Sequence, residues 1–298
     1  LPLTIRQQNM AELEETNGAL LHNILRKEND NYIAMPVGSS GHDVLERVCG
    51  DDGLDVLIDA GALVLELTNR EVAWRWLDQR KDRRAAVYFE GDRIDVVDRY
   101  GLSTPLAVSP FERSLGDCLL YLDDEHTRGC DFELPIGRRA AVTLGKGVLK
   151  DKFAQAVMRM RLLGRGHTLS FIASFEADLQ IVSWRVGSLS FRGSAAFTVA
   201  HSTNADGLEH LPAILSWCLN NTVQATYDRL LHLAVQGACH LRKRQALSQF
   251  DAARLETVIK ACTPCAEREA LSLDESYGYS SKPELLPEVV RNLFLNNM

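Results

Sequence analysis

The sequence predicts an α/β protein with a mostly parallel sheet, followed by a helical region. Short apolar runs suited to buried strands alternate with helical patterns through the first 175 residues, an order typical of parallel sheets. Asp59 directly follows the run at 55–58, and a carboxylate in this position lies where open α/β sheets bind their ligands. From residue 208 onward the apolar pattern is helical.

The composition is that of a globular protein. The apolar fraction is 46% and the charged fraction 24%. The net charge of −7 argues against a general nucleic-acid coat protein, although a local basic patch remains open. No apolar run reaches the roughly 20 residues that span a bilayer. Seven irregularly spaced cysteines do not suggest a disulfide framework. We therefore expect an intracellular protein, cytoplasmic or nuclear, with reduced thiols.

The individual elements are expected in the following order. Before residue 55 we expect a helix at 11–27, a short strand at 32–37 and a loop at 38–41. After the strand at 55–58 we expect a helix at 69–80 with Asn69 as its N-cap, strands at 85–89 and 94–97, and a proline-containing loop at 104–112. Further strands are expected at 119–122, 140–144 and 167–173, with a helix at 151–163 before the last.

The chain is expected to divide into four parts. These are an N-terminal connecting segment at 1–40, an α/β lobe at 41–175, an extension at 176–206 with strand-like pieces at 181–184 and 195–199, and a helical region at 207–298. Within the helical region we expect helices at 212–234, 250–261 and 286–295. The sequence starts at Leu1 without a signal-peptide pattern, and we expect it to be a piece of a longer protein.

A charged loop follows the strand expected at 119–122. It has the order Asp124, three residues, Arg128-Gly129, one residue and Asp131. This order resembles the loop of the second RecA-like lobe of superfamily-two helicases, which touches the nucleotide and the nucleic-acid strand. The resemblance implies a RecA-like sheet of the helicase C-terminal-lobe type. A solvated loop after a strand is the alternative interpretation.

A second motif lies on the helix expected at 151–163. Gln155 and Arg159 match the helicase pattern Gln-x-x-Gly-Arg-x-x-Arg, at about the distance from the first motif that this fold requires. A guanidinium in this place stabilises the charge that spreads over a transferring phosphoryl group. The alternative is a solvated helix face with ordinary ion pairs.

This second motif departs from the helicase pattern at two positions. Met158 replaces the glycine, and Leu162 stands where the second arginine is expected, so Arg161 or Arg165 would have to substitute. The sequence also contains no Gly-x4-Gly-Lys-Ser/Thr phosphate-binding loop. ATP and Mg²⁺ are therefore implied only together with a first lobe that this sequence does not contain.

A thiol nucleophile is a further alternative. Cys130 and Cys118, each with His126 as base, are weak candidates, because a cysteine peptidase needs a thiolate beside an imidazole. Cys118 equally suits the start of a buried strand. Cys262 and Cys265 form a single Cys-x-x-Cys pair. A structural zinc site usually has two such pairs, so no metal site is expected.

Several blocks resemble very large fungal proteins identified as ubiquitinyl hydrolases, a family of thiol-dependent deubiquitinases. The blocks are residues 58–77, 85–99, 118–135, 140–166 and 214–237. The resemblance implies ubiquitin-linked proteolysis, ubiquitin or a ubiquitinated protein as partner, and a position within a much larger chain. No block matches a protease box, so no catalytic Cys–His pair carries over.

Three functions therefore remain open. The first is a helicase-like lobe, without thiol chemistry of its own, inside a deubiquitinase. The second is the nucleotide-dependent lobe of a helicase or translocase, with nucleic acid as a partner that the net charge does not favour. The third is a scaffold that only binds partners.

Overall fold

A computed structural model describes residues 16–190 and 210–248 of the chain. The elements expected at 195–199, 250–261 and 286–295, and the pair Cys262 and Cys265, lie outside these residues. The chain divides into two compact units, Leu1–Asn221 and Thr222–Met298. The sheet described below belongs to the first unit.

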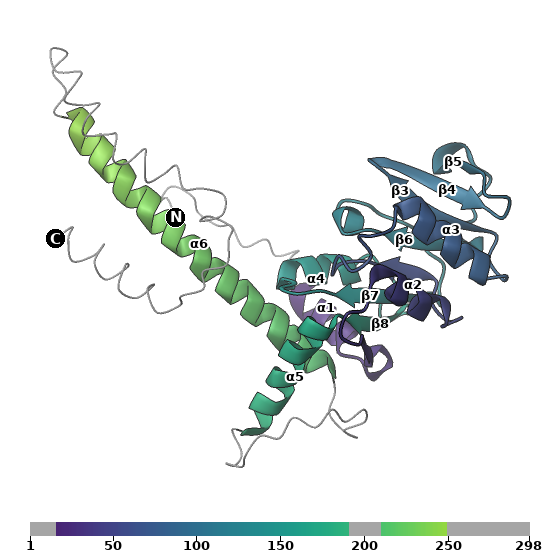
Figure 1. Cartoon of the computed structure of the whole chain (residues 1–298), viewed down its shortest axis with the longest axis horizontal. Helices are drawn as coiled ribbons and strands as arrows, with labels where there is room; N and C mark the ends of the chain where they lie inside the picture. Colours follow the sequence, from purple (N-terminus) through teal and green to yellow (C-terminus); the bar gives the residue numbers. More distant parts are fainter. Residues whose placement is uncertain (1–15, 191–209, 249–298) are drawn as a thin grey trace. The chain divides into compact units, whose positions relative to one another are not determined.

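One eight-stranded sheet organises the first unit (Figure 1). Its strands are β1 (Asn31–Ala34), β2 (Val56–Ile58), β3 (Ala85–Glu90), β4 (Arg93–Asp98), β5 (Ser103–Pro105), β6 (Cys118–Leu122), β7 (Arg139–Leu144) and β8 (Thr168–Ala173). Their spatial order is β1-β8-β7-β2-β6-β3-β4-β5. The first six strands in this order are parallel, and β4 and β5 add an antiparallel edge. The predicted mixed α/β fold with a mostly parallel sheet is thus confirmed.

Helices cover both faces of this sheet. The helices are α1 (Thr16–Ile24), α2 (Gly41–Cys49), α3 (Asn69–Gln79), α4 (Lys150–Val157), α5 (Phe175–Ser190) and α6 (His210–Ser248). The apolar sides of α2 and α3 pack on one face, and those of α1, α4, α5 and the first turns of α6 pack on the other. Because both faces are covered, β2 and β6 are buried along their whole length, which explains their unbroken apolar sequences.

Capping boxes start the two helices of the α2–α3 face. The Ser40 and Asp43 pair starts α2, and the Thr68 and Glu71 pair starts α3. In each box the hydroxyl accepts from a backbone N–H in the first turn while the carboxylate accepts from the N-cap N–H. The predicted N-cap of α3, Asn69, is wrong by one residue, because its side chain bonds across the sheet edge instead.

β1 overlaps the short strand expected at 32–37 and pairs with β8 as the outermost parallel strand. β5 occupies the start of the loop expected at 104–112 and pairs with β4. Pro105 is tolerated there because β5 is an edge strand, on which a missing N–H leaves no partner unsatisfied.

Residues 175–190 form α5, so the strand-like piece expected at 181–184 is wrong. Ala177 and Ile181 lie one helical turn apart and are both buried against the sheet. Three apolar residues within a run of four are too few to distinguish a strand from a buried helical turn.

α4 ends at Val157, before the expected end at residue 163. The N–H of Met160 bonds to the carbonyl of Val157 at 3.1 Å, an i to i−3 contact that tightens the chain into turns. Gly164 and Gly166 then adopt φ values of 79° and 118°, which other residues rarely reach, and these glycines end the turns before β8.

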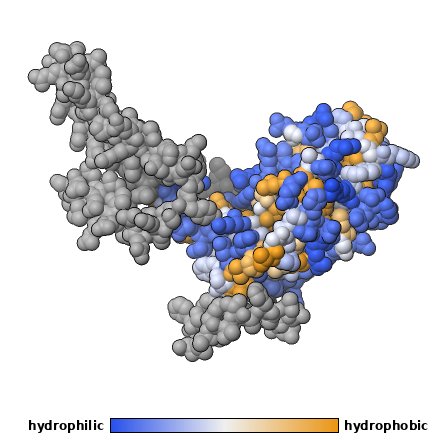
Figure 2. Space-filling view, in the orientation of Figure 1, coloured by the Kyte–Doolittle hydropathy of each residue, from blue (hydrophilic) through white to orange (hydrophobic). Residues whose placement is uncertain are grey.

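The surface of the first unit is largely polar. On the face shown in Figure 2, hydrophilic residues dominate and apolar patches lie between them. Large apolar side chains that remain exposed include Leu65, Tyr100 and Val108. Among the described helices, none is both long and apolar enough to cross a bilayer.

Candidate functional site

The strand order creates one topological switch point. From β2 the chain passes to β3 and β6 on one side, and it then crosses to β7 and β8 on the other. The carboxyl ends of β2, β6 and β7 meet at this point, because the three strands are parallel neighbours. Open α/β sheets place their ligands here. The polar residues at this edge are Asp59 after β2, Asp123 and Asp124 after β6, and Thr143 within β7.

Asp59 is only 1% exposed, and its carboxylate organises the loop after β2. It accepts hydrogen bonds from Oγ1 of Thr143 at 2.6 Å and from the N–H groups of Leu63 and Val64 at 2.9 and 3.0 Å. Burial raises the pKa of Asp59 even though these bonds oppose the shift. A raised pKa means that this carboxyl supports the fold most when protonated, and that its contribution falls as the pH rises through that pKa.

The loops after β2 and β7 touch backbone to backbone. The N–H of Gly61 donates to Oγ1 of Thr143 at 2.8 Å. A Cβ atom on Gly61 would overlap the backbone of Leu144 and Gly145, and one on Gly145 would overlap the carbonyl of Gly61. Two glycines are therefore needed for this contact, which closes the switch point beside Asp59.

We predict that Thr143→Val lowers the free energy of unfolding by about 1–3 kcal/mol. Valine keeps the shape of threonine but removes the hydroxyl between Asp59 and the Gly61 N–H, which leaves both groups buried without this partner. Urea denaturation measures the loss. Thr143→Ser keeps the hydroxyl and serves as the control. If the serine variant loses as much stability as the valine variant, the methyl group rather than the hydrogen bonds determines the effect.

The loop after β6 is held at its start by Asp123. One carboxylate oxygen accepts from the N–H of His126 at 2.9 Å and contacts Nδ1 of the same residue at 2.6 Å. The other oxygen accepts from Nδ2 of Asn69 at 2.6 Å. The His126 ring stacks on Phe89 with ring centroids 3.9 Å apart. These contacts connect the loop to the carboxyl end of β3 and to the first turn of α3.

Two ion pairs connect the same loop to α4 and the turns that follow it. Asp124 pairs with Lys152 in the first turn of α4. Asp131 pairs with Nε of Arg161 at 2.8 Å, and this hydrogen bond, with the charges of Arg161 and Arg159, holds the pKa of Asp131 below its usual value. The structure therefore brings the two sequence motifs together along one side of the sheet.

The remaining predicted motif residues are accessible. Arg128 and Gln155 are exposed, and Arg159 is half-buried with its Nε donating to the Gln155 carbonyl at 3.2 Å. Gly129 has a φ of 75°, which explains why a glycine follows Arg128 at the turn of the loop. Arg161 forms an ion pair with Asp131, whereas the hydrogen bond of Arg159 goes to a neutral backbone carbonyl.

The expected pairing of Cys118 with His126 is wrong. The two residues lie at opposite ends of β6, about 13 Å of strand apart. Sγ of Cys118 faces the carbonyl of Ser114 at 3.8 Å, and burial raises its pKa to about 12. A buried thiol in this state is a poor nucleophile.

Cys130 does lie near His126 but meets its backbone. Its Sγ donates to the His126 carbonyl at 3.0 Å, whereas Nδ1 of the imidazole is engaged by Asp123. Burial raises the pKa of Cys130, and the nearby charge of Arg159 only partly offsets this. Burial also raises the pKa of Cys49 to about 11 and that of Cys218 to about 12. Within the described residues, none of these four thiols is activated.

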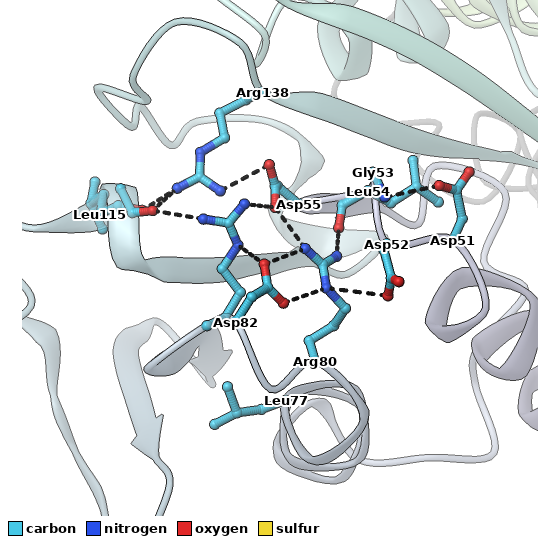
Figure 3. Close-up of polar contacts among 12 residues, drawn as sticks. Asp51, Asp52, Gly53, Leu54, Asp55, Leu77, Arg80, Asp82, Leu115 and Arg138 are labelled. Atoms are coloured by element: carbon cyan, nitrogen blue, oxygen red, sulfur yellow. Dashed lines mark hydrogen bonds and ion pairs between the residues drawn. The ribbon is translucent and has the colours of Figure 1, made fainter.

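Sequence reasoning missed a buried charge cluster at the amino end of the sheet (Figure 3). The carboxylate of Asp55 contacts guanidinium nitrogens of Arg83 at 2.6 Å, Arg138 at 2.9 Å and Arg80 at 3.3 Å. Arg138 also donates to the carbonyl of Leu115 at 3.2 Å. No local pattern could reveal this cluster, because its arginines come from distant segments. All three arginines of the cluster contact protein groups, so we assign the cluster a role in stability.

A small cavity of about 100 Å³ lies near the carboxyl ends of β1 and β8. Its lining includes Met35, Gly38, Val44, Leu63 and Phe175. A nucleotide-sized ligand needs roughly 300 Å³ or more. In the part of the chain that the structure describes, no group of three or more His, Cys, Asp or Glu residues is arranged to hold a metal ion.

Comparisons of the chain with protein-family models, with curated proteins and with solved structures found no match.

Proposed function

We propose that this chain is a RecA-like lobe that corresponds to the second lobe of superfamily-two helicases, and that it is contained in a larger protein of the ubiquitinyl hydrolase family. The observation that carries the proposal is the ion pair of Asp131 with Arg161, which joins the two motifs, while Asp124 pairs with Lys152 on the helix that carries Gln155. Motif residues on separate elements belong to one functional surface only if the fold brings them together.

The position of the motifs in the fold also supports this proposal. The Arg-Gly-x-Asp loop leaves the carboxyl end of β6, and α4 with Gln155 and the following turn with Arg159 lie between β7 and β8. Phe132 from the loop and Phe153 from α4 enter the same apolar core. The two motifs therefore share one face of a parallel sheet, next to its switch point.

In the proposed function the lobe supplies only part of a nucleotide site. Arg159 is the residue assigned to the phosphates, where a guanidinium stabilises the charge on the transferring group. The lack of a phosphate-binding loop in this sequence fits a lobe that works with a partner lobe. ATP and Mg²⁺ would be held mainly by that partner.

Thiol chemistry is assigned to another part of the larger protein. Burial raises the pKa values of the Cys118 and Cys130 thiols, and the hydrogen bonds described for these two thiols go to the backbone carbonyls of Ser114 and His126. Under this proposal, ubiquitin or a ubiquitinated protein is the substrate of the larger protein, and the lobe described here moves or positions it.

The test is ATP hydrolysis by the natural gene product that contains this chain. We expect Arg159→Ala to lower the rate at least tenfold, because arginines that contact a transferring phosphoryl group contribute about 10³–10⁵ in rate. Arg113→Ala is the matched control, because this arginine has a side chain 94% exposed and lies outside both motifs. Equal rates for the two variants, or no hydrolysis by the wild-type protein, would refute the nucleotide role.

A second readout separates the lobe from the peptidase. Ubiquitin with a C-terminal electrophile is incubated with this chain and with the natural gene product, and adducts are detected by intact mass. We expect an adduct on the larger protein and none on this chain, because a protonated, buried thiol reacts slowly. An adduct on this chain would locate the nucleophile here and contradict the assignment.

A further inference from the structure

The two segments that carry the motif residues meet at a second place, the side chain of His167. One segment is the loop after β6, and the other is the arginine turn, by which we mean residues 158–163 after α4. His167 directly precedes β8 and is only 1% exposed. Its Nε2 lies 2.9 Å from the carbonyl oxygen of Pro135 at the end of the loop, and its Nδ1 lies 3.2 Å from the backbone nitrogen of Leu162 in the arginine turn. The imidazole therefore bridges the two segments.

The two contacts define the hydrogens on the His167 ring. The carbonyl oxygen of Pro135 can only accept a hydrogen bond, so Nε2 must carry a hydrogen and donate it. The backbone N–H of Leu162 can only donate, so Nδ1 must offer a lone pair. The neutral tautomer with its hydrogen on Nε2 satisfies both partners. A ring nitrogen in each direction is thus required, and a hydrocarbon ring of the same shape would leave both partners without this contact.

The contact at His167 is the more protected of two links between the loop and the arginine turn. The other link, the ion pair of Asp131 with Arg161, has side chains that are 64% and 47% exposed, and exposed pairs contribute little. Leu162 meets His167 twice, because its carbonyl oxygen also accepts from the His167 backbone N–H at 3.1 Å. Hydrogen bonds shielded from water by a buried ring are harder to replace.

We propose that His167 is a positioning residue for Arg159 and Arg161. The ring is buried, so it acts through the backbone of Leu162, which directly follows Arg161 and lies three residues after Arg159. This inference rests on the proposed function, in which Arg159 meets the phosphates. A guanidinium stabilises a transferring phosphoryl group only if it is held in place beforehand, and a displacement of about 1 Å can cost about a hundredfold in rate.

His167→Phe in the natural gene product tests this role. Phenylalanine keeps a planar ring but has neither nitrogen, so both contacts are lost. We expect kcat for ATP hydrolysis to fall about tenfold to a hundredfold, because the arginine acts on the transition state. The KM for ATP should change by less than about threefold, since the partner lobe holds most of the nucleotide.

Asn29→Ala is the matched control, because Asn29 is another buried polar side chain at the start of β8. It is 0% exposed, and its Oδ1 accepts from the N–H of Leu169 at 2.9 Å. Its Nδ2 donates to the carbonyl oxygens of Asn23 and Ile24 at 2.9 and 3.2 Å. This variant loses buried hydrogen bonds but keeps both links to the arginine turn, so kcat should stay within about twofold of the wild-type value. Urea denaturation compares the stability of the two variants.

Hydrogen exchange of the Leu162 amide, resolved by fragmentation mass spectrometry, measures the positioning without ATP. The described acceptor of this N–H is Nδ1 of His167. We expect its exchange to be at least about tenfold faster in His167→Phe and close to the wild-type rate in Asn29→Ala, because a lost hydrogen bond favours local opening.

Two results would overturn the role of His167: unchanged exchange of the Leu162 amide in His167→Phe, or equal values of kcat in the two variants. Failure of the proposed function looks different. A wild-type protein that hydrolyses no ATP would refute the nucleotide role, whereas faster exchange at Leu162 in His167→Phe alone would still support His167 as the residue that holds the arginine turn in place.

Discussion

Replacement of Asp55 with alanine is expected to lower the free energy of unfolding by about 3–5 kcal/mol. The Asp55 side chain is 7% exposed and contacts the guanidinium groups of Arg80, Arg83 and Arg138. The side chains of Arg80 and Arg138 are themselves 1% and 5% exposed. Removal of the carboxylate leaves their positive charges in a buried position with fewer counterions, which costs far more than the loss of a surface ion pair.

Urea denaturation of the Asp55→Ala variant measures this loss, and Asp117→Ala is the control. Asp117 also binds an arginine, Arg84, at 3.3 Å, but the two side chains are 49% and 69% exposed. Exposed ion pairs contribute about 0–1 kcal/mol. A loss at Asp55 no larger than at Asp117 would show that the cluster is solvated and that the buried charge is not what holds this end of the sheet together.

The second large effect is expected at the glycine contact beside the switch point. Gly61→Ala should lower the free energy of unfolding by about 3 kcal/mol or more, at or beyond the upper end for added atoms in a packed interior. The new methyl group would overlap the backbone of Leu144 and Gly145, and a backbone cannot move aside as the tip of a side chain can. The hydrogen bond from Gly61 to Thr143 would be disturbed as well.

Gly18→Ala is the control for this substitution. Gly18 lies in α1, and apart from its neighbours and the backbone of its own helix, no atom lies within 4 Å of the position that its Cβ would occupy. An alanine there should stabilise the protein by about 0.5–1 kcal/mol, because glycine is a weak helix former. Thermal or urea denaturation of both variants gives the comparison. A small effect at Gly61 would mean that the loops after β2 and β7 can separate without unfolding the sheet.

The parallel strands could be predicted from the sequence because their signal is local. The runs at β2 and β6 are continuous and apolar, as expected of strands covered on both faces, and in β7 Thr143 is the one polar residue among 140–144. α5 could not be predicted in the same way. Its first half is helical because Ala177 and Ile181 find a sheet face to cover, and a short apolar run does not specify such a partner.

The candidate site was predictable in its residue types and order but not in its contacts. Asp124, Asp131 and the arginines of the second motif could be located from spacing alone. Their partners could not: Lys152 binds Asp124, and Arg161 binds Asp131, because a loop and a helix meet over one face of the sheet. The pairing of Cys118 with His126 could not be judged from their closeness in sequence, because β6 is extended and separates the two residues.

By itself the sequence determined the alternation of strands and helices, the absence of a phosphate-binding loop, and the residues that the two motifs contain. These properties depend on neighbours a few residues apart. Only the tertiary structure decided the strand order, the burial of Asp59 and the charge cluster at Asp55, whose three arginines lie 25, 28 and 83 residues further along the chain. Energies of buried charges depend on which distant groups exclude water from them, and the folded chain alone specifies those groups.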